Sequence, residues 1–95
     1  MNPIEELTQF YPEVIEQMPE RFNAHEFILE LAHQHQSFYI QALAQYVDSQ
    51  RPFKIVHGQL ASALHQFDDL IYHIGDESNT NIFGRTSDAS VWGKK

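Results

Sequence analysis

The chain has 95 residues, a formal net charge of −7 and no cysteine, so it should form a single domain (1–95) without disulfides or cysteine-bound metal ions. The absence of cysteine, and of a signal-peptide pattern at the acidic start of the chain, leads us to expect a cytoplasmic protein. No apolar run approaches the ~20 residues of a membrane span, and the negative charge repels phosphate backbones and anionic membranes.

Residues 1–21 should form an N-terminal arm of two short helical pieces, about 3–10 and 12–18. Pro12 divides them, because proline is disfavoured inside a helix but acceptable in its first turn. Apolar residues of the arm are spaced by three and four, as on one side of a helix: Ile4, Leu7, Tyr11, Val14 and Met18. The arm either packs on the rest of the protein or presents Tyr11 and its acidic surface to a partner or a second copy of the chain.

Two apolar stripes at helical spacing follow, within a predicted helical core at 22–75. They predict a helical hairpin of about 24–49 and 53–74. Asn23 is a suitable N-cap for the first helix, and Pro52 is acceptable in the first turn of the second.

The end of the second helix has two interpretations. Gly75 is a typical residue to follow the last turn of a helix that runs to Ile74. Asp68-Asp69 could instead cap a separate short helix, so the stripe is compatible with one helix or two.

Residues 76–95 form a tail in which turn-forming polar residues surround two short apolar segments, Ile82-Phe83 and Val91-Trp92. The tail contains too few apolar residues to fold alone. Phe83 and Trp92 should therefore dock on the hairpin, either from irregular chain or from a small β-ribbon.

Five of the six histidines fall on eight-residue spacings within the two predicted helices: His25, His33, His57, His65 and His73. Eight residues of helix span about 12 Å, too far for a pair to share one ion. The Glu30-x-x-His33 motif resembles half of a di-iron bundle site, but it should face water. We expect no metal site and no cofactor.

His57 differs because it lies inside an apolar stripe and precedes Gly58. A half-buried histidine needs a hydrogen-bond partner, and a small neighbour lets a ligand or another backbone approach closely. Catalysis would require a group that orients the imidazole, and Asp68 and Asp69 are too far along the helix to do so. We therefore expect no enzyme.

A nucleic-acid role would require a winged helix-turn-helix, with Asp68–Ile74 as the recognition helix and the tail as the wing. That helix would begin with two acids and contain no lysine or arginine. Only the tail, with Arg85, Lys94 and Lys95, is mildly basic, so binding to nucleic acid is not favoured.

Four sequence segments resemble those of a group of short uncharacterised bacterial proteins: Phe22–Ile28, Tyr39–Leu43, Pro52–Leu60, and Asn81–Gly84 together with Trp92. The resemblance covers about residues 22–92 and leaves out the arm. It implies a shared structural unit, and it implies no activity, cofactor or site residue.

The sequence therefore predicts a mainly α protein: a helical hairpin with an N-terminal helical arm and a docked tail. We expect a non-catalytic protein-interaction module with a protein partner, possible homodimers and no membrane contact. The alternatives are a nucleic-acid-associated regulator with a degenerate winged-helix arrangement, and a small-ligand protein or enzyme that uses His57. The candidate binding residues are Tyr11, His57, Gly58, Phe83 and Trp92.

Overall fold

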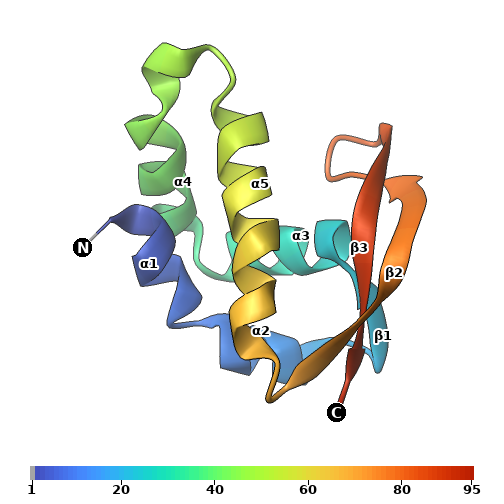
Figure 1. Ribbon diagram of the computed structural model, residues 1–95. Helices are drawn as coiled ribbons and strands as arrows, with labels where there is room; N and C mark the ends of the chain where they lie inside the picture. Colours follow the sequence, from blue (N-terminus) through green and yellow to red (C-terminus); the bar gives the residue numbers. More distant parts are fainter. Residues whose placement is uncertain (1) are drawn as a thin grey trace.

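The computed structural model describes residues 2–95, and this part of the chain forms five α-helices and a three-stranded antiparallel sheet (Figure 1). The protein is therefore of the α+β class, and the prediction of a mainly α helical hairpin was wrong. The elements are α1 (Pro3–Thr8), α2 (Tyr11–Gln17), β1 (Arg21–Asn23), α3 (Ala24–Gln34), α4 (Gln36–Gln45), η1 (Val47–Ser49), α5 (Pro52–Ala63), η2 (Leu64–Phe67), β2 (Ile71–Thr80) and β3 (Thr86–Lys94).

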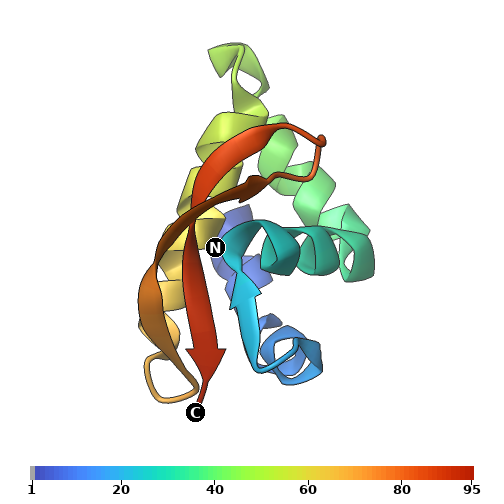
Figure 2. The same ribbon diagram turned by 90° about the vertical axis from the view of Figure 1, so that its right-hand side faces the viewer.

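The sheet has the strand order β1-β3-β2, so the last strand of the chain lies in the middle. Figure 2 shows β3 between its two neighbours, with the helices behind the sheet. β3 pairs with β1 through Phe22 opposite Trp92, and with β2 over the whole length of a hairpin. Of the two forms expected for the tail, a β-ribbon is the one observed, and it begins earlier and is longer than expected.

The predicted second helix is shorter than expected because residues 71–74 belong to β2. α5 ends at Ala63, one 3₁₀ turn follows, and the chain then turns into the strand. Ile71, Tyr72 and Ile74 are the β-branched and aromatic types that fit a sheet, although their spacing also fits a helix. Gly75 follows a register shift in the β2–β3 pairing and does not cap a helix.

The predicted first helix is broken at His35, which joins α3 to α4 with non-helical backbone angles (φ −128°, ψ 56°). The imidazole stacks on Phe10, with ring centroids 3.8 Å apart. The break changes the direction of the chain, so that α4 packs against both α1 and α5. A single irregular residue leaves the three-and-four spacing of the apolar residues intact, and this is why the sequence pattern did not reveal it.

The predicted helix starts are confirmed. The Asn23 side chain accepts a hydrogen bond from the Glu26 backbone, and the Glu26 carboxylate accepts one from the Asn23 backbone, which completes a capping box. Pro52 occupies the first turn of α5. The arm forms two helices, as expected, with Pro12 in the first turn of the second.

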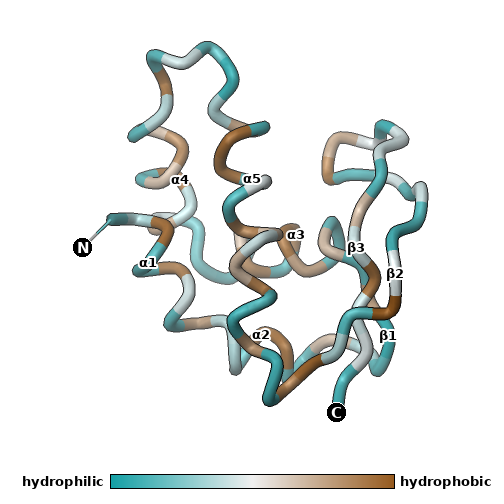
Figure 3. Tube along the Cα trace, in the orientation of Figure 1, coloured by the Kyte–Doolittle hydropathy of each residue, from teal (hydrophilic) through white to brown (hydrophobic). Residues whose placement is uncertain are grey.

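The N-terminal arm is an integral part of the hydrophobic core. Six of its apolar residues are buried in the same cluster as those of α3, α5 and the sheet: Ile4, Leu7, Tyr11, Val14, Ile15 and Met18. Phe10 is partly buried and packs against that cluster. Figure 3 shows hydrophobic residues alternating with hydrophilic ones along the chain in α1, α2, α3 and α5. The expectation that the arm packs on the helices is thus confirmed.

Hydrogen bonds to the last residues hold the arm to the end of the chain. The Lys94 ammonium donates to the carbonyls of Glu16 and Met18 at the C-terminus of α2, at 2.9 and 3.0 Å. A cation at this end of a helix satisfies free carbonyls and interacts favourably with the helix dipole. The Lys94 backbone also donates to the Glu20 carbonyl, so the two ends of the chain stabilise each other.

Tyr11 should be the residue of the arm whose replacement costs most. Its ring is fully buried, and its hydroxyl donates to the Leu60 carbonyl of α5 at 2.6 Å. Tyr11→Phe should lower the free energy of unfolding by about 1 kcal/mol through loss of that hydrogen bond. Tyr11→Ala should lower it by about 3–5 kcal/mol because it leaves a cavity. Urea unfolding followed by circular dichroism measures both; equal, small effects would contradict this packing.

Candidate functional site

A cleft of about 620 Å³ lies between the side of α5 and the β2–β3 hairpin, with the start of α3 as its floor. α5 contributes Phe53, Lys54, His57, Gly58 and Ala61 to its walls. The hairpin contributes residues on both strands and at its tip: Asp76, Asn81, Phe83, Ser87, Asp88, Ala89 and Ser90. Ala24, His25 and Ile28 of α3 complete the lining.

Local structure places Phe83 at the mouth of the cleft. Asn81 begins the hairpin turn, and its side-chain oxygen accepts hydrogen bonds from the backbones of Phe83 and Arg85, at 2.9 and 3.1 Å. Gly84 has a φ of +78°, a conformation that side chains rarely adopt, and its backbone donates to the Asn81 carbonyl. Hydrogen bonds within the turn thus fix its conformation and the position of Phe83.

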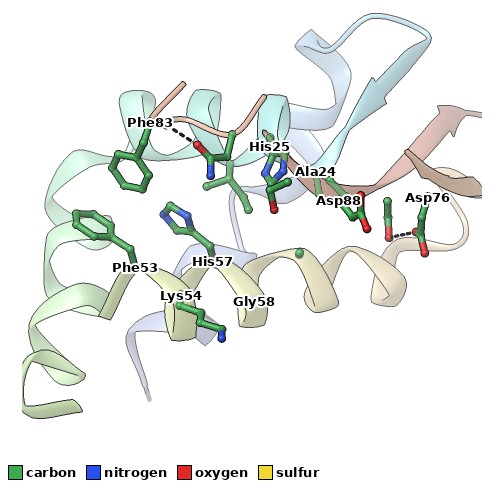
Figure 4. A pocket seen from close by; sticks show the side chains of 15 residues that line it. Ala24, His25, Phe53, Lys54, His57, Gly58, Asp76, Phe83 and Asp88 are labelled. Atoms are coloured by element: carbon green, nitrogen blue, oxygen red, sulfur yellow. Dashed lines mark hydrogen bonds between the residues drawn. The ribbon is translucent and has the colours of Figure 1, made fainter. Parts of the chain in front are cut away.

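Three aromatic rings line one end of the cleft, those of Phe53, His57 and Phe83, and Tyr39 of α4 stacks on His57. We call these four residues the aromatic cluster. Phe53 and Phe83 meet edge to face with centroids 4.7 Å apart, and Phe83 stacks on His57 at 6.0 Å. Figure 4 shows the two phenyl rings next to each other, with the imidazole of His57 beside them. Both phenyl rings are about half exposed, at 44% and 52%.

Two carboxylates form the other end of the cleft. Asp76 of β2 pairs with Ser90, and Asp88 of β3 pairs with Ser78, so both acids lie on the same face of the hairpin. Ser90 donates to the Asp76 carboxylate at 3.0 Å. Asp88 has no such bond among the described residues, and in Figure 4 its carboxylate lies near Asp76, away from the phenyl rings. The cleft therefore has an aromatic end and an acidic end.

The imidazole of His57 links the cleft to α4. Its Nε2 lies 2.6 Å from the Tyr39 hydroxyl, and burial raises the pKa of that tyrosine to about 12, so the hydroxyl keeps its proton. Burial, with a smaller contribution from the neighbouring His25, lowers the pKa of His57. A neutral His57 accepts from the Tyr39 hydroxyl when its proton is on Nδ1, and donates to the hydroxyl oxygen when its proton is on Nε2.

The structure brings together three of the five candidate residues. His57, Gly58 and Phe83 all line the cleft, and Gly58 has no atom within 4 Å of the place where a Cβ would lie. Tyr11 is fully buried and bonded to Leu60, so its side chain is not available at the surface. Trp92 is also buried, and it contacts His65 and His73 on a different part of the molecule.

The sequence interpretation missed Phe53, Tyr39 and the two acids of the cleft. A signal for Phe53 was present, because it lies four residues before His57 and therefore on the same side of α5. Asp76 and Asp88 had no comparable signal. Their positions follow from the register of a hairpin whose first residues, 71–74, were predicted to be helical.

Among residues 2–95, no three histidine or carboxylate side chains are arranged to hold a metal ion. Within the same part of the chain, no helix is both long enough and apolar enough to cross a membrane. Comparisons with protein-family models, curated proteins and solved structures give no match.

The lowered pKa of His57 predicts a pH dependence of stability. A histidine in an unfolded chain titrates near pH 6.5. Just below this pH, His57 therefore binds a proton more readily in the unfolded chain than in the folded one. The contribution of His57 should be complete above pH 6.5 and should be lost as the pH falls toward its folded pKa. Urea unfolding at pH 7.5 and 5.5 measures the loss.

His57→Gln should reduce that loss, whereas His33→Gln provides the control, since His33 is exposed on α3. An identical pH dependence in the wild type and in His57→Gln would contradict the assignment of a hard-to-protonate His57.

Proposed function

We propose that this protein is a non-catalytic protein-interaction module of the cytoplasm, and that the cleft between α5 and the β2–β3 hairpin binds a segment of its partner. The observation that carries the proposal is the half-exposed pair Phe53 and Phe83 at the mouth of a preformed cleft. Aromatic residues at the rim of a concave, largely apolar site are typical anchors for protein segments.

The mouth of the cleft is held in place before any partner binds. The Asn81 turn sets the position of Phe83, and the Tyr39–His57 hydrogen bond sets the position of the imidazole on which it stacks. Binding then costs less ordering of side chains, which favours affinity. The open space beside Gly58 leaves room for a partner's side chain or backbone.

Peptides selected from a random displayed library on the purified chain test the proposal. Selected peptides should shift amide resonances of the cleft residues. Phe53→Ala and Phe83→Ala should each weaken their binding by about tenfold or more, as expected for interface anchors. Fluorescence anisotropy with labelled peptides measures the affinity.

Matched controls are Leu29→Ala and Val47→Ala, which also remove exposed apolar side chains but lie outside the cleft lining. Gly58→Leu should block binding while the melting temperature stays at or above that of the wild type, because leucine is the better helix former. The proposal would be refuted if the affinity of the peptides fell in Leu29→Ala or Val47→Ala and stayed unchanged in the cleft variants.

A second candidate function, nucleic-acid binding, is favoured by a specific observation. Helices that end with α5 separate β1 from the β2–β3 hairpin, and the sheet order is β1-β3-β2. This order resembles a winged helix-turn-helix, with three α-helices, α3, α4 and α5, between β1 and β2. α5 then takes the place of the recognition helix, in place of residues 68–74, which lie in a turn and in β2. Residues 51–67 contain no acid, and Arg51, Lys54 and Arg85 are exposed around this face.

We nevertheless rank this candidate second, because Asp76, Glu77 and Asp88 lie on the strands that would approach the phosphates. Two further cations are engaged elsewhere: Arg21 pairs with Glu77 and Lys94 caps α2. The remaining positive charge is small for binding to a polyanion.

Anisotropy of a labelled 30-base-pair duplex at 20 mM salt tests the second candidate. If α5 and the hairpin tip bind DNA, three phosphate contacts should give a salt slope of about −2.7. The triple change of Arg51, Lys54 and Arg85 to Gln should abolish binding, whereas Lys95→Gln should change it little. The absence of binding at 20 mM salt would eliminate this function.

A further inference from the structure

We infer that the segment bound in the cleft carries a lysine or arginine close to a large apolar side chain. This inference rests on the proposed function and specifies the partner's chemistry. It follows from the two unlike ends of one cleft: the aromatic cluster receives the apolar group, and the carboxylates of Asp76 and Asp88 receive the cation.

The hairpin register holds the two carboxylates close to each other. Asp76 faces Ser90, and Ser78 faces Asp88, so the two acids are diagonal neighbours across β2 and β3. Such neighbours are about 7–8 Å apart on one face of a sheet. Two negative charges at that separation repel each other, and a cation placed between them interacts favourably with both.

The basic residues of the chain leave this end of the cleft negative. Lys54 lines the cleft from α5, but Figure 4 shows its chain running along the helix, away from the phenyl rings and away from Asp76 and Asp88. His73 lies beside Asp76, with its Nε2 3.4 Å from the carboxylate, and it balances that charge only when it is protonated. A phosphate or a carboxylate would be repelled at this end, whereas an ammonium or guanidinium group would be attracted.

The aromatic end favours the same kind of segment. Aromatic faces attract cations as well as apolar groups, and Phe53 and Phe83 both present exposed ring surface. The stem of a lysine or arginine is apolar along most of its length. Such a side chain can pass the rings of the cluster and place its charge near the hairpin acids.

Library selection against the wild type and against the double variant Asp76→Asn, Asp88→Asn tests the inference. Peptides selected on the wild type should be enriched in lysine or arginine beside a large apolar residue. Their affinity should fall about fivefold in the double variant and with rising salt, since partly exposed ion pairs are individually weak. Asparagine keeps a side-chain oxygen that can accept from Ser90.

The matched control is Asp48→Asn, Asp69→Asn, which removes the same net charge from exposed positions outside the cleft lining; it should leave affinity unchanged. Replacing arginine by citrulline in a selected peptide should abolish the difference between wild type and double variant.

The outcomes separate the two proposals. Peptides that require Phe53 and Phe83 but lack basic residues and ignore Asp76 and Asp88 would overturn this inference and leave the proposed function standing. Peptides that do not use the cleft would overturn both. The double variant could also bind duplex DNA, and with a higher affinity than it binds any selected peptide. That result would overturn the inference as well.

Discussion

The pairing of β3 with both β1 and β2 is the constraint on which the rest of this structure depends. It brings residues 91–93 beside residues 21–23, so the end of the chain lies against the connection between α2 and α3. It also closes the hairpin whose face forms one wall of the cleft. Backbone hydrogen bonds inside the sheet are obligatory for these strands, and they determine where every side chain of the hairpin points.

Packing of the N-terminal helices follows from the same arrangement. Lys94 extends from the end of β3 to the free carbonyls of α2, and Tyr11 crosses from α2 to the Leu60 carbonyl of α5. The N-terminal arm is therefore a structural part of the core, although its composition is acidic. The carboxylates of the arm remain at or near the surface.

The cleft combines local and long-range causes. Phe53 and His57 lie one turn apart on α5, and the local hydrogen bonds of Asn81 present Phe83. Only the folding of the hairpin against α5 brings Phe83 onto both rings. The same folding places Asp76 and Asp88 at the opposite end, which makes the site chemically asymmetric.

Features that depend on near neighbours could be predicted from the sequence alone. They include the two pieces of the arm around Pro12, the N-cap at Asn23 and the position of Pro52 in the first turn of α5. Each is determined by the backbone chemistry of a few adjacent residues. His57, Gly58 and Phe83 were also recognised as candidates, because a histidine and a glycine within an apolar stripe and an aromatic residue in a polar loop are locally unusual.

The tertiary structure decided what local spacing could not. Ile71 to Ile74 fit a helix and a strand equally well, and only pairing with β3 makes them a strand. The break at His35 leaves the spacing of the apolar residues unchanged and is stabilised by Phe10, far away in the sequence. Burial of Tyr11 and Trp92, and the meeting of Asp76 with Asp88, likewise arise from contacts between distant segments, because only chain folding brings such residues together.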